Sequence, residues 1–261
     1  MATRKDQAHN SSLGVVAKRF QEIVLSSSLE RQAFLNELND SPLSKDGILI
    51  AGLGNPGSKY ANNRHNIGFL IVDRLCDFLG ITMEQIPRFR AACATIPTHH
   101  IHIIQPQTFM NLSGEAIVEI MRFFKLQQLL VVHDELDIPF GAIRYKFGGS
   151  SGGHNGLKSI DLMLQSNAYA RLRFGIAESS TPQIDSTIPK SNLTKQNVIS
   201  FVLGDFPNDH KDELNTLINH SVRSLLFFLQ TRDFKAMQNF FTLSKSKLCP
   251  FKAQNNTRDG V

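Results

Sequence analysis

A short apolar run at Ile48–Leu53, with the sequence ILIAGL, limits the possible folds more than any other stretch of the chain. The run is uninterrupted, which is typical of a strand buried on both faces, and it ends at a loop of glycine and proline. Leu129–Val132 is a second such run. Helical apolar spacing follows the first run at Asn66–Leu79 and precedes the second at Leu112–Phe124. Strands that alternate with helices predict an α/β fold.

A pair of further strands interrupts the parallel pattern. Ala91–Ile96 and His100–Ile104 are joined around Pro97 and Thr98, which predicts a hairpin. Two strands joined by a hairpin are antiparallel, so the sheet is expected to be mixed. We therefore predict a single α/β domain with a twisted mixed β-sheet flanked by helices. Its remaining elements are expected to be strands at Ile143–Phe147 and Leu172–Ile176, helices at Asn155–Leu164, Asp209–Leu229 and Asp233–Phe241, and a mobile loop at Thr181–Thr194.

The first 46 residues differ in composition from the rest of the chain. They are rich in serine, asparagine and charges of both signs, although apolar residues have helical spacing in places. Ser27 and Glu30 have the spacing of a capping box, which predicts a short helix. We interpret residues 1–46 as a weakly folded N-terminal extension, with targeting or partner binding as the alternative. Residues 47–244 are assigned to the α/β domain, and the basic tail 245–261 is expected to be disordered.

Composition restricts the compartment and the partners. Three cysteines lie far apart without a CxxC pair, so neither a disulfide framework nor a structural zinc site is expected, and a reducing compartment fits. The longest apolar runs are far shorter than the roughly 20 residues that cross a bilayer. The net charge is +5, and residues 245–261, with four basic and one acidic side chain, supply +3 of it. A nucleic-acid partner must therefore be argued from local patches rather than from bulk charge.

One glycine motif has two interpretations. The sequence from Gly52 to Gly57, GLGNPG, matches the GxGxxG pattern of dinucleotide-binding sites. In such sites a helix begins inside the motif and directs its N-terminus at pyrophosphate. Here Pro56 and the polar residues after it delay any apolar helical pattern to about Ile67. A dinucleotide-dependent oxidoreductase is therefore the least favoured interpretation, and we expect this strand end to present side chains instead.

Polar side chains gather where the predicted strands end. Asn55 follows the first buried strand, and Asp134 lies just beyond the second. Ligands of open α/β sheets sit at the carboxyl ends of the strands, so these two residues are expected at one site. Three more polar residues stand at loop or helix-start positions, namely His65, Asn111 and Asn155.

Four blocks of sequence resemble the signature blocks of the bacterial-type peptidyl-tRNA hydrolase family. They are GLGNPGSKYANNRHNIGF, QPQTFMNLSGEA, VVHDELDIPFG and GGSSGGHNGLKSI, and the resemblance covers about residues 47–240. It implies a single α/β domain with a mixed sheet. It also implies hydrolysis of the ester that joins a peptide to the 3′-terminal ribose of tRNA, which recycles the tRNA, without a metal or an organic cofactor.

The resemblance also implies roles for the polar residues. His65 matches the general base, since a neutral imidazole can take a proton from the attacking water. Asp134 would hold the other nitrogen of that imidazole. Asn111 would place the water or donate to the oxyanion. Asn55 and Asn155 would orient the terminal adenosine and the peptide backbone.

Further residues match positions that contact tRNA or line the cleft. Lys146 and Arg173 match residues that hold tRNA phosphates near the 5′ end, although either could be a solvated surface charge. Such contacts position the substrate without reading its sequence. Tyr60 and Phe109 match aromatic residues beside the cleft, although each could simply pack.

Several other residues are not expected to take part in catalysis or differ from the family pattern. A cluster of histidines at 99, 100 and 102 lacks the spacing of a metal site, and His133 and His154 are expected to brace loops. Asn63 stands where the family usually has threonine, and Gln105 replaces a frequent lysine. A non-catalytic RNA-binding relative is the alternative function. We expect a monomer that binds peptidyl-tRNA, does not bind membranes and is cytoplasmic, with an organelle as the alternative compartment.

Overall fold

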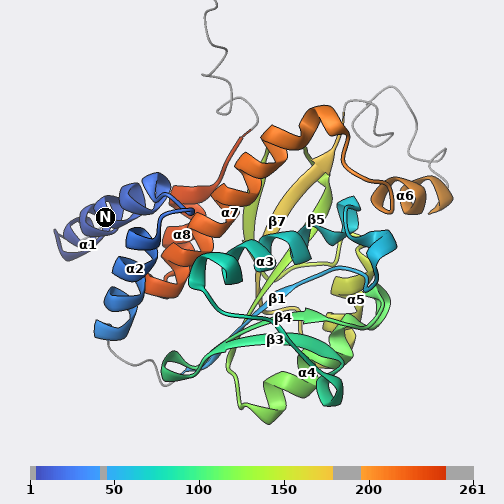
Figure 1. Cartoon of the computed structure of the whole chain (residues 1–261), viewed down its shortest axis with the longest axis horizontal. Coiled ribbons are helices and arrows are strands. Elements are labelled where there is room, and N and C mark those ends of the chain that lie inside the picture. Colours follow the sequence, from blue (N-terminus) through green and yellow to red (C-terminus); the bar gives the residue numbers. More distant parts are fainter. Residues whose placement is uncertain (1–3, 42–45, 179–194, 245–261) are drawn as a thin grey trace, which may run out of the picture.

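A mixed seven-stranded sheet forms the centre of the computed structural model, which describes residues 4–41, 46–178 and 195–244 (Figure 1). The strand order is β2-β3-β4-β1-β5-β7-β6. The strands are β1 (Ile48–Gly52), β2 (Glu84–Ile86), β3 (Ala91–Ile96), β4 (Ile101–Pro106), β5 (Gln128–Pro139), β6 (Ile143–Phe147) and β7 (Ala170–Ala177). The helices are α1 (Arg4–Glu22), α2 (Ser28–Asp40), α3 (Ile67–Leu79), α4 (Ser113–Phe123), α5 (Asn155–Leu164), α6 (Lys195–Val202), α7 (Lys211–Thr231) and α8 (Phe234–Phe241).

The middle of the sheet is parallel and its margins are antiparallel. β1 lies between β4 and β5 and is parallel to both, and β7 is parallel to β5. The predicted hairpin forms β3 and β4, while β2 and β6 pair antiparallel at the two margins. The predicted α/β class with a mixed sheet is thus confirmed. β2 and α6 are elements that the apolar pattern did not indicate.

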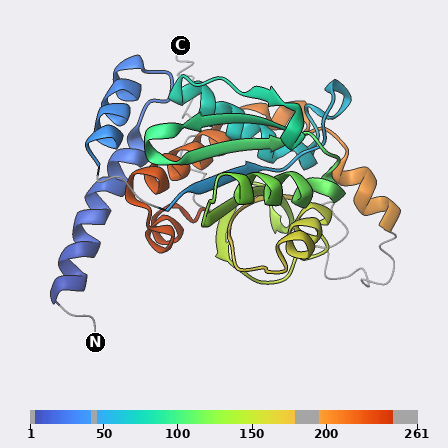
Figure 2. The same ribbon diagram turned by 90° about the horizontal axis from the view of Figure 1, so that it is seen from below.

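Helices cover both faces of the sheet, as the two perpendicular views show (Figures 1 and 2), and a hydrophobic cluster lies on each face. Ile48 and Ile50 of β1 contribute to the larger cluster, with buried residues of α3, α7 and α8. Leu49 and Ala51 contribute to the smaller cluster, with α4 and α5. This alternation follows from the two-residue period of a strand, and burial on both faces explains why β1 is apolar throughout.

The N-terminal extension differs from its prediction. α1 and α2 pack against the domain, and Phe20, Phe34 and Leu38 are buried in the larger cluster. The ring of Phe20 meets those of Phe34 and Phe227 edge to face, each at 6.0 Å between centroids. Ser27 caps α2 by accepting a hydrogen bond from Glu30 N, as expected. The described part of the extension is therefore a helical hairpin in the core, because α7 and α3 supply an apolar face that the local sequence does not reveal.

The second buried strand is longer than predicted. β5 continues through His133 and Asp134 to Pro139, so both residues lie within a strand rather than after it. β1 pairs with β5 only as far as Val132, whereas β7 pairs with β5 through His133, Asp134 and Glu135. Pairing with β7 extends the strand through a polar stretch. Among the described residues, no strand pairs with β5 on the β1 side beyond Gly52, which leaves room for the residues described below.

Close contact between α3 and the ends of β1 and β5 fixes the position of the first turn of α3 relative to the sheet. A Cβ atom on Gly68 would lie 2.4 Å from Leu53 N and from Val132 O, so only glycine fits there. Gly80 ends α3 in the left-handed conformation at φ 68°, as predicted. The predicted loop at Thr181–Thr194 and the tail 245–261 lie outside the described residues. Among those residues, no helix is both long enough and apolar enough to cross a membrane.

Candidate active site

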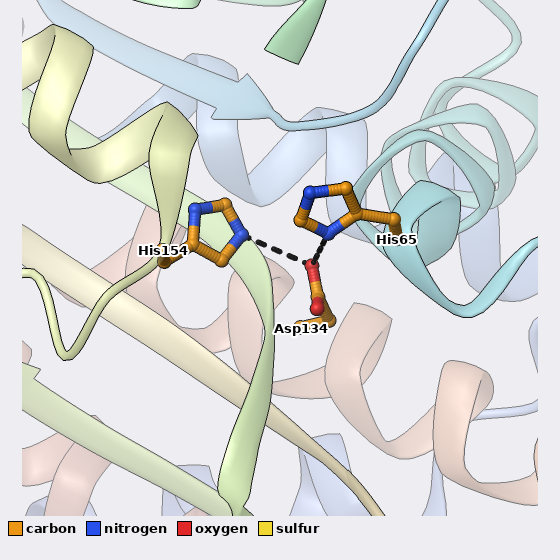
Figure 3. Close-up of side chains that lie close together, drawn as sticks. All are labelled: His65, Asp134 and His154. Atoms are coloured by element: carbon orange, nitrogen blue, oxygen red, sulfur yellow. Dashed lines mark hydrogen bonds and ion pairs between the residues drawn. The ribbon is translucent and has the colours of Figure 1, made fainter. Parts of the chain in front are cut away.

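His65 lies at the carboxyl end of the sheet. It stands in a 3-10 turn, Arg64–Asn66, directly before α3, and it is 8% exposed. Its Nδ1 lies 2.7 Å from Oδ1 of Asp134 on β5 (Figure 3). The sequence predicted this pair, and the structure brings together two residues that are 69 positions apart. Because Nδ1 faces the carboxylate, Nε2 is the nitrogen that can exchange a proton with a reactant.

A second histidine, His154, contacts the same carboxylate oxygen. Its Nε2 lies 3.0 Å from Asp134 Oδ1 (Figure 3). Its Nδ1 accepts hydrogen bonds from Gly156 N and Leu157 N, so His154 caps the N-terminus of α5. A nitrogen that accepts two amide protons carries no proton itself, and Nε2 therefore carries the hydrogen that it donates to Asp134. His154 thus couples the Asp134 carboxylate to the helix that begins with Asn155.

The buried charges shift the pKa values in opposite directions. Burial would lower the pKa of His65, but the charge of Asp134 and its hydrogen bond outweigh burial and raise that pKa. Burial would raise the pKa of the Asp134 carboxyl, but His65 and His154 hold it well below its usual range. Burial, followed by the charge of His154, holds the pKa of His133 well below the ordinary histidine value. Asp134 is therefore an anion, and His133 is neutral.

Asn55 is held in place by two neighbours. Its backbone N donates to Asn66 Oδ1 and its backbone O accepts from Asn66 Nδ2, both at 2.9 Å. Its side-chain Oδ1 accepts from Met110 N at 2.9 Å, which leaves Nδ2 as the amide group available for a ligand. Met110 begins the 3-10 turn Met110–Leu112 that carries Asn111. Asn55 therefore ties the loop after β1 to the loop after β4.

The other predicted site residues lie nearer to solvent. Asn111 and Asn155 are exposed, the first in its 3-10 turn and the second at the start of α5. Phe109 is 55% exposed, and Tyr60 is half-buried. These side chains make no hydrogen bond to the His65–Asp134 pair within the described residues, so their roles rest on position.

Basic residues gather on β6 and β7. Arg144 is paired with Arg173 and Lys146 with Arg171 in the antiparallel register, which places all of them on one face. Lys146 is exposed and lies over the glycine-rich loop, since a Cβ on Gly149 would be 2.5 Å from its Nζ. Arg173 Nε donates to Glu135 Oε2 at 2.9 Å, so part of its charge is compensated. Lys146 is therefore the freer of the two predicted phosphate contacts.

The hydrogen bonds that His65, Asp134 and His154 already make argue against a metal ion bound between them. Within the described residues, the ligand atoms of His65, Asp134 and His154 lie within 4.8 Å of one another, close enough for a metal ligand set. However, the two nitrogens are at hydrogen-bond distance from the carboxylate, and His154 Nε2 carries its proton. Metal ligation would require that proton to leave. The expectation that the reaction needs no metal stays a prediction.

Similarity to known proteins decides the family. The peptidyl-tRNA hydrolase family model matches residues 49–248. The chain belongs to the peptidyl-tRNA hydrolase family. It is 41% identical over 217 residues to the peptidyl-tRNA hydrolase of Helicobacter hepaticus, an alignment that covers 80% of this chain and 91% of that protein. It is 37% identical over 195 residues to the enzyme of Campylobacter fetus, covering 75% and 98% of the two chains.

A solved structure agrees with this assignment. The crystal structure of peptidyl-tRNA hydrolase from Acinetobacter baumannii matches with a TM-score of 0.65 and 34% identity, over 77% of this chain and 97% of that one. The peptidyl-tRNA hydrolase match begins at residue 49, so α1 and α2 lie outside it. The dinucleotide interpretation is not supported, because GLGNPG leads into a 3-10 turn, Ser58–Tyr60, and the next α-helix begins only at Ile67.

Asn63 and Gln105, the two residues that differ from the usual peptidyl-tRNA hydrolase motifs, both form hydrogen bonds to carboxylates. Asn63 Nδ2 donates to Asp205 Oδ1 at 2.6 Å, and Gln105 Nε2 donates to Asp73 Oδ1 at 2.7 Å. His99 and His102 contact Thr98 and Phe124 respectively. Within the described residues, the histidines at 99, 100 and 102 form no metal ligand set.

Two residues with a clear place in this site were not assigned roles from the sequence. The sequence predicts only a loop-bracing role for His154 and the start of a helix at Asn66. The signal for His154 was its position immediately before a helix, where side chains that accept hydrogen bonds from backbone N–H are favoured. No local signal identified Asp134 as its partner.

Proposed function

We propose that this chain hydrolyses the ester between a peptide and the 3′-terminal ribose of tRNA, with His65 as the general base. The single observation that carries the mechanism is the 2.7 Å contact between His65 Nδ1 and Asp134 Oδ1. In that contact Nδ1 carries a proton and donates it in a hydrogen bond to Asp134, so the unprotonated Nε2 is free to act as the base. The family membership supports the substrate.

The reaction proceeds by attack of water on the ester carbonyl. His65 Nε2 takes a proton from the water while its oxygen bonds to the carbonyl carbon, and the carbonyl oxygen becomes an oxyanion. Collapse of this intermediate breaks the bond to the ribose oxygen, which takes the proton back from the imidazolium. The products are a peptide with a free carboxylate and a tRNA with a free 3′-hydroxyl. Asp134 remains an anion throughout and stabilises the imidazolium.

Amide side chains orient the reactants. Asn111 places the water or donates to the oxyanion, and its exposed position on a 3-10 turn suits contact with a ligand. Asn55 offers its Nδ2 as a donor from a side chain whose oxygen is already held by Met110 N. Asn155 stands at the start of α5, and together with Asn55 it orients the terminal adenosine and the peptide backbone. Preorganised donors of this kind need little rearrangement during the reaction.

The tRNA is held from the β6 and β7 side of the site. Lys146 and Arg173 contact phosphates near the 5′ end, with Lys146 contributing the less compensated charge. Tyr60 and Phe109 flank the cleft, where an exposed aromatic ring can stack on a base. The protein acts as a cytoplasmic monomer without a metal, and peptidyl-tRNA is its partner.

Replacement of the base tests the mechanism. His65→Ala is expected to lower kcat for hydrolysis of an N-blocked aminoacyl-tRNA by roughly 10²- to 10⁴-fold, since proton transfer to a positioned base is lost. The measurement is release of the blocked amino acid under single-turnover conditions, alongside wild-type protein. Full activity of His65→Ala would exclude this mechanism, and an inactive wild type would exclude the function.

The phosphate contact is tested in the same assay. Lys146→Ala is expected to raise KM for the tRNA substrate and to reduce the dependence of kcat/KM on salt, because one counterion-releasing contact is lost. Hydrolysis of a small N-blocked amino-acid ester should change little, as it carries no phosphate. Equal losses on both substrates would contradict a phosphate contact.

A further inference from the structure

Arg64, the residue before His65, has no role in the mechanism above, yet it is almost fully buried. It is 7% exposed and stands in the same 3-10 turn as the proposed base. A buried guanidinium is costly unless its donors are paired, so the partners of Arg64 indicate what the burial achieves.

Its guanidinium joins two segments that are distant in the sequence. Nη2 donates to Glu178 Oε1 at 2.5 Å, just beyond the end of β7. Nη1 donates to the backbone O of Asp205 at 2.7 Å, in the segment that follows α6. The charged group also lies over the ring of Phe201 on α6, with Cζ 4.3 Å from the ring centroid. One side chain thus contacts a carboxylate, a carbonyl and an aromatic face.

The backbone around Arg64 contacts the same segment. Arg64 N donates to Gly204 O at 3.0 Å, and Asn63 forms an isolated antiparallel bridge with Asp205. A Cβ on Gly204 would lie 3.1 Å from Arg64 Nη1, so the segment approaches the guanidinium closely. The contacts of Asn63 and Arg64 with residues 201–205 therefore form a continuous attachment.

The three residues of the turn are tied to three different parts of the fold. Arg64 is tied to Glu178 and the segment after α6, His65 to Asp134 on β5, and Asn66 to Asn55 after β1. The turn is short, so rotation or displacement of Arg64 moves its neighbour. The position of the His65 imidazole relative to Asp134 depends on all three ties.

We propose that Arg64 is a positioning residue, which holds the turn so that His65 Nδ1 stays on Asp134 and Nε2 faces the substrate. The inference rests on the proposed role of His65. Lysine cannot replace arginine here. The guanidinium of Arg64 donates from two separate nitrogens and its plane stacks on Phe201, whereas a lysine ammonium has a single nitrogen and no planar group. Displacement of a reacting group by about 1 Å can lower the rate of the chemical step by roughly 10²-fold.

The test uses Arg64→Lys in the full-length chain, with Arg90→Lys as the matched control. Arg90 also pairs with a glutamate, at 2.6 Å from Glu115, but its side chain is 49% exposed and it ends a different 3-10 turn, Pro87–Phe89. For Arg64→Lys we expect kcat on N-blocked aminoacyl-tRNA to fall by roughly 10- to 10²-fold, with KM within about twofold of wild type. The acid limb of the pH profile should move to lower pH, because the imidazole loses part of the influence of Asp134. Arg90→Lys should leave all three quantities unchanged.

Glu178→Gln provides a second variant should Arg64→Lys fail to fold. It preserves the shape of the partner and removes the carboxylate charge, so we expect a smaller fall in kcat and a shift of the acid limb in the same direction. Wild-type kcat and an unmoved acid limb in the folded variants would overturn the inference. A lower melting temperature with an unmoved acid limb would also overturn it, since it would show a purely structural role. An inactive wild type, or an active His65→Ala, would instead overturn the proposed function.

Discussion

At the scale of single residues, the site depends on one carboxylate that serves two imidazoles. Asp134 Oδ1 accepts from His65 Nδ1 and from His154 Nε2, and the tautomer of His154 is set by its cap on α5. The same oxygen therefore orients the His65 imidazole and connects it to the helix that carries Asn155. A charged acceptor buried to 3% exposure can hold both donors firmly, because water does not compete for it.

Removal of this charge has a predictable effect on pH dependence. The pKa of His65 is raised because the charge and hydrogen bond of Asp134 outweigh burial. Asp134→Asn removes the charge that opposes burial, so the pKa of His65 is expected to fall. His65 must be neutral to act as a base. The acid limb of kcat/KM is therefore expected at lower pH in the variant, while kcat falls by roughly 10²- to 10⁴-fold because tautomer and orientation are no longer fixed.

The control for this prediction is Asp137→Asn, an exposed carboxylate on the same strand. It should leave both the rate and the acid limb unchanged. The measurement is the pH profile of kcat/KM for each variant. An acid limb that stays in place or moves to higher pH in Asp134→Asn would contradict the electrostatic account of His65.

At the scale of elements, the distance between α3 and the strand ends sets the position of the turn that carries His65. α3 begins at Ile67, and Gly68 is in contact with the backbones of Leu53 and Val132. No side chain fits in this space. The first turn of α3 can therefore approach β1 and β5 closely enough for His65 to reach Asp134, which lies two residues beyond Val132.

Two glycine substitutions are expected to act in opposite directions. Gly68→Ala places a methyl group 2.4 Å from backbone atoms and should destabilise the fold by about 1–3 kcal/mol, with a fall in kcat because the turn is displaced. Gly14→Ala, inside α1, meets only the ring of Phe240 at 3.9 Å and should stabilise by about 0.5–1 kcal/mol. Chemical denaturation measures both. Equal effects of the two substitutions would contradict the close-approach argument.

At the scale of the whole molecule, the N-terminal hairpin and the active site lie at opposite ends. Figure 1 shows α1 and α2 beside α7 and α8 at one end, and α6 at the other. The segment that follows α6 holds the turn of His65, as the contacts of Arg64 show. The hairpin therefore contributes to the stability of the domain while remaining remote from the chemistry.

A matched pair of substitutions tests this separation. Phe20→Ala removes a fully buried ring that contacts Phe34 and Phe227, and should cost about 3–5 kcal/mol of unfolding free energy. Leu29→Ala, at 82% exposure on α2, should change it by less than about 0.5 kcal/mol. The folded fraction of each variant should keep the wild-type kcat. A Phe20→Ala protein as stable as wild type would show that the hairpin is an appendage after all.

Much of this architecture follows from short-range patterns. The run Ile48–Leu53 predicted β1, the spacing of Asn66–Leu79 predicted α3, and Gly80 marked the end of that helix. Residue type and position also indicated His65 and Asp134, through four motifs that are specific to a family. Such features can be predicted because periodicity, capping and turn chemistry depend on residues within a few positions of each other.

Contacts between distant segments were decided only by the tertiary structure. Pairing with β7 carried β5 through His133 and Asp134, although their polar sequence predicted a loop. The apolar faces of α7 and α3 turned an expected appendage into part of the core. The partners of Arg64 lie more than a hundred residues along the chain, at Glu178 and Asp205. The sequence by itself determined most of the helices and strands and which residues can react, because these depend on neighbouring residues. Only the tertiary structure decided β2, α6, the length of β5 and which reactive residues meet, because these depend on contacts between distant segments.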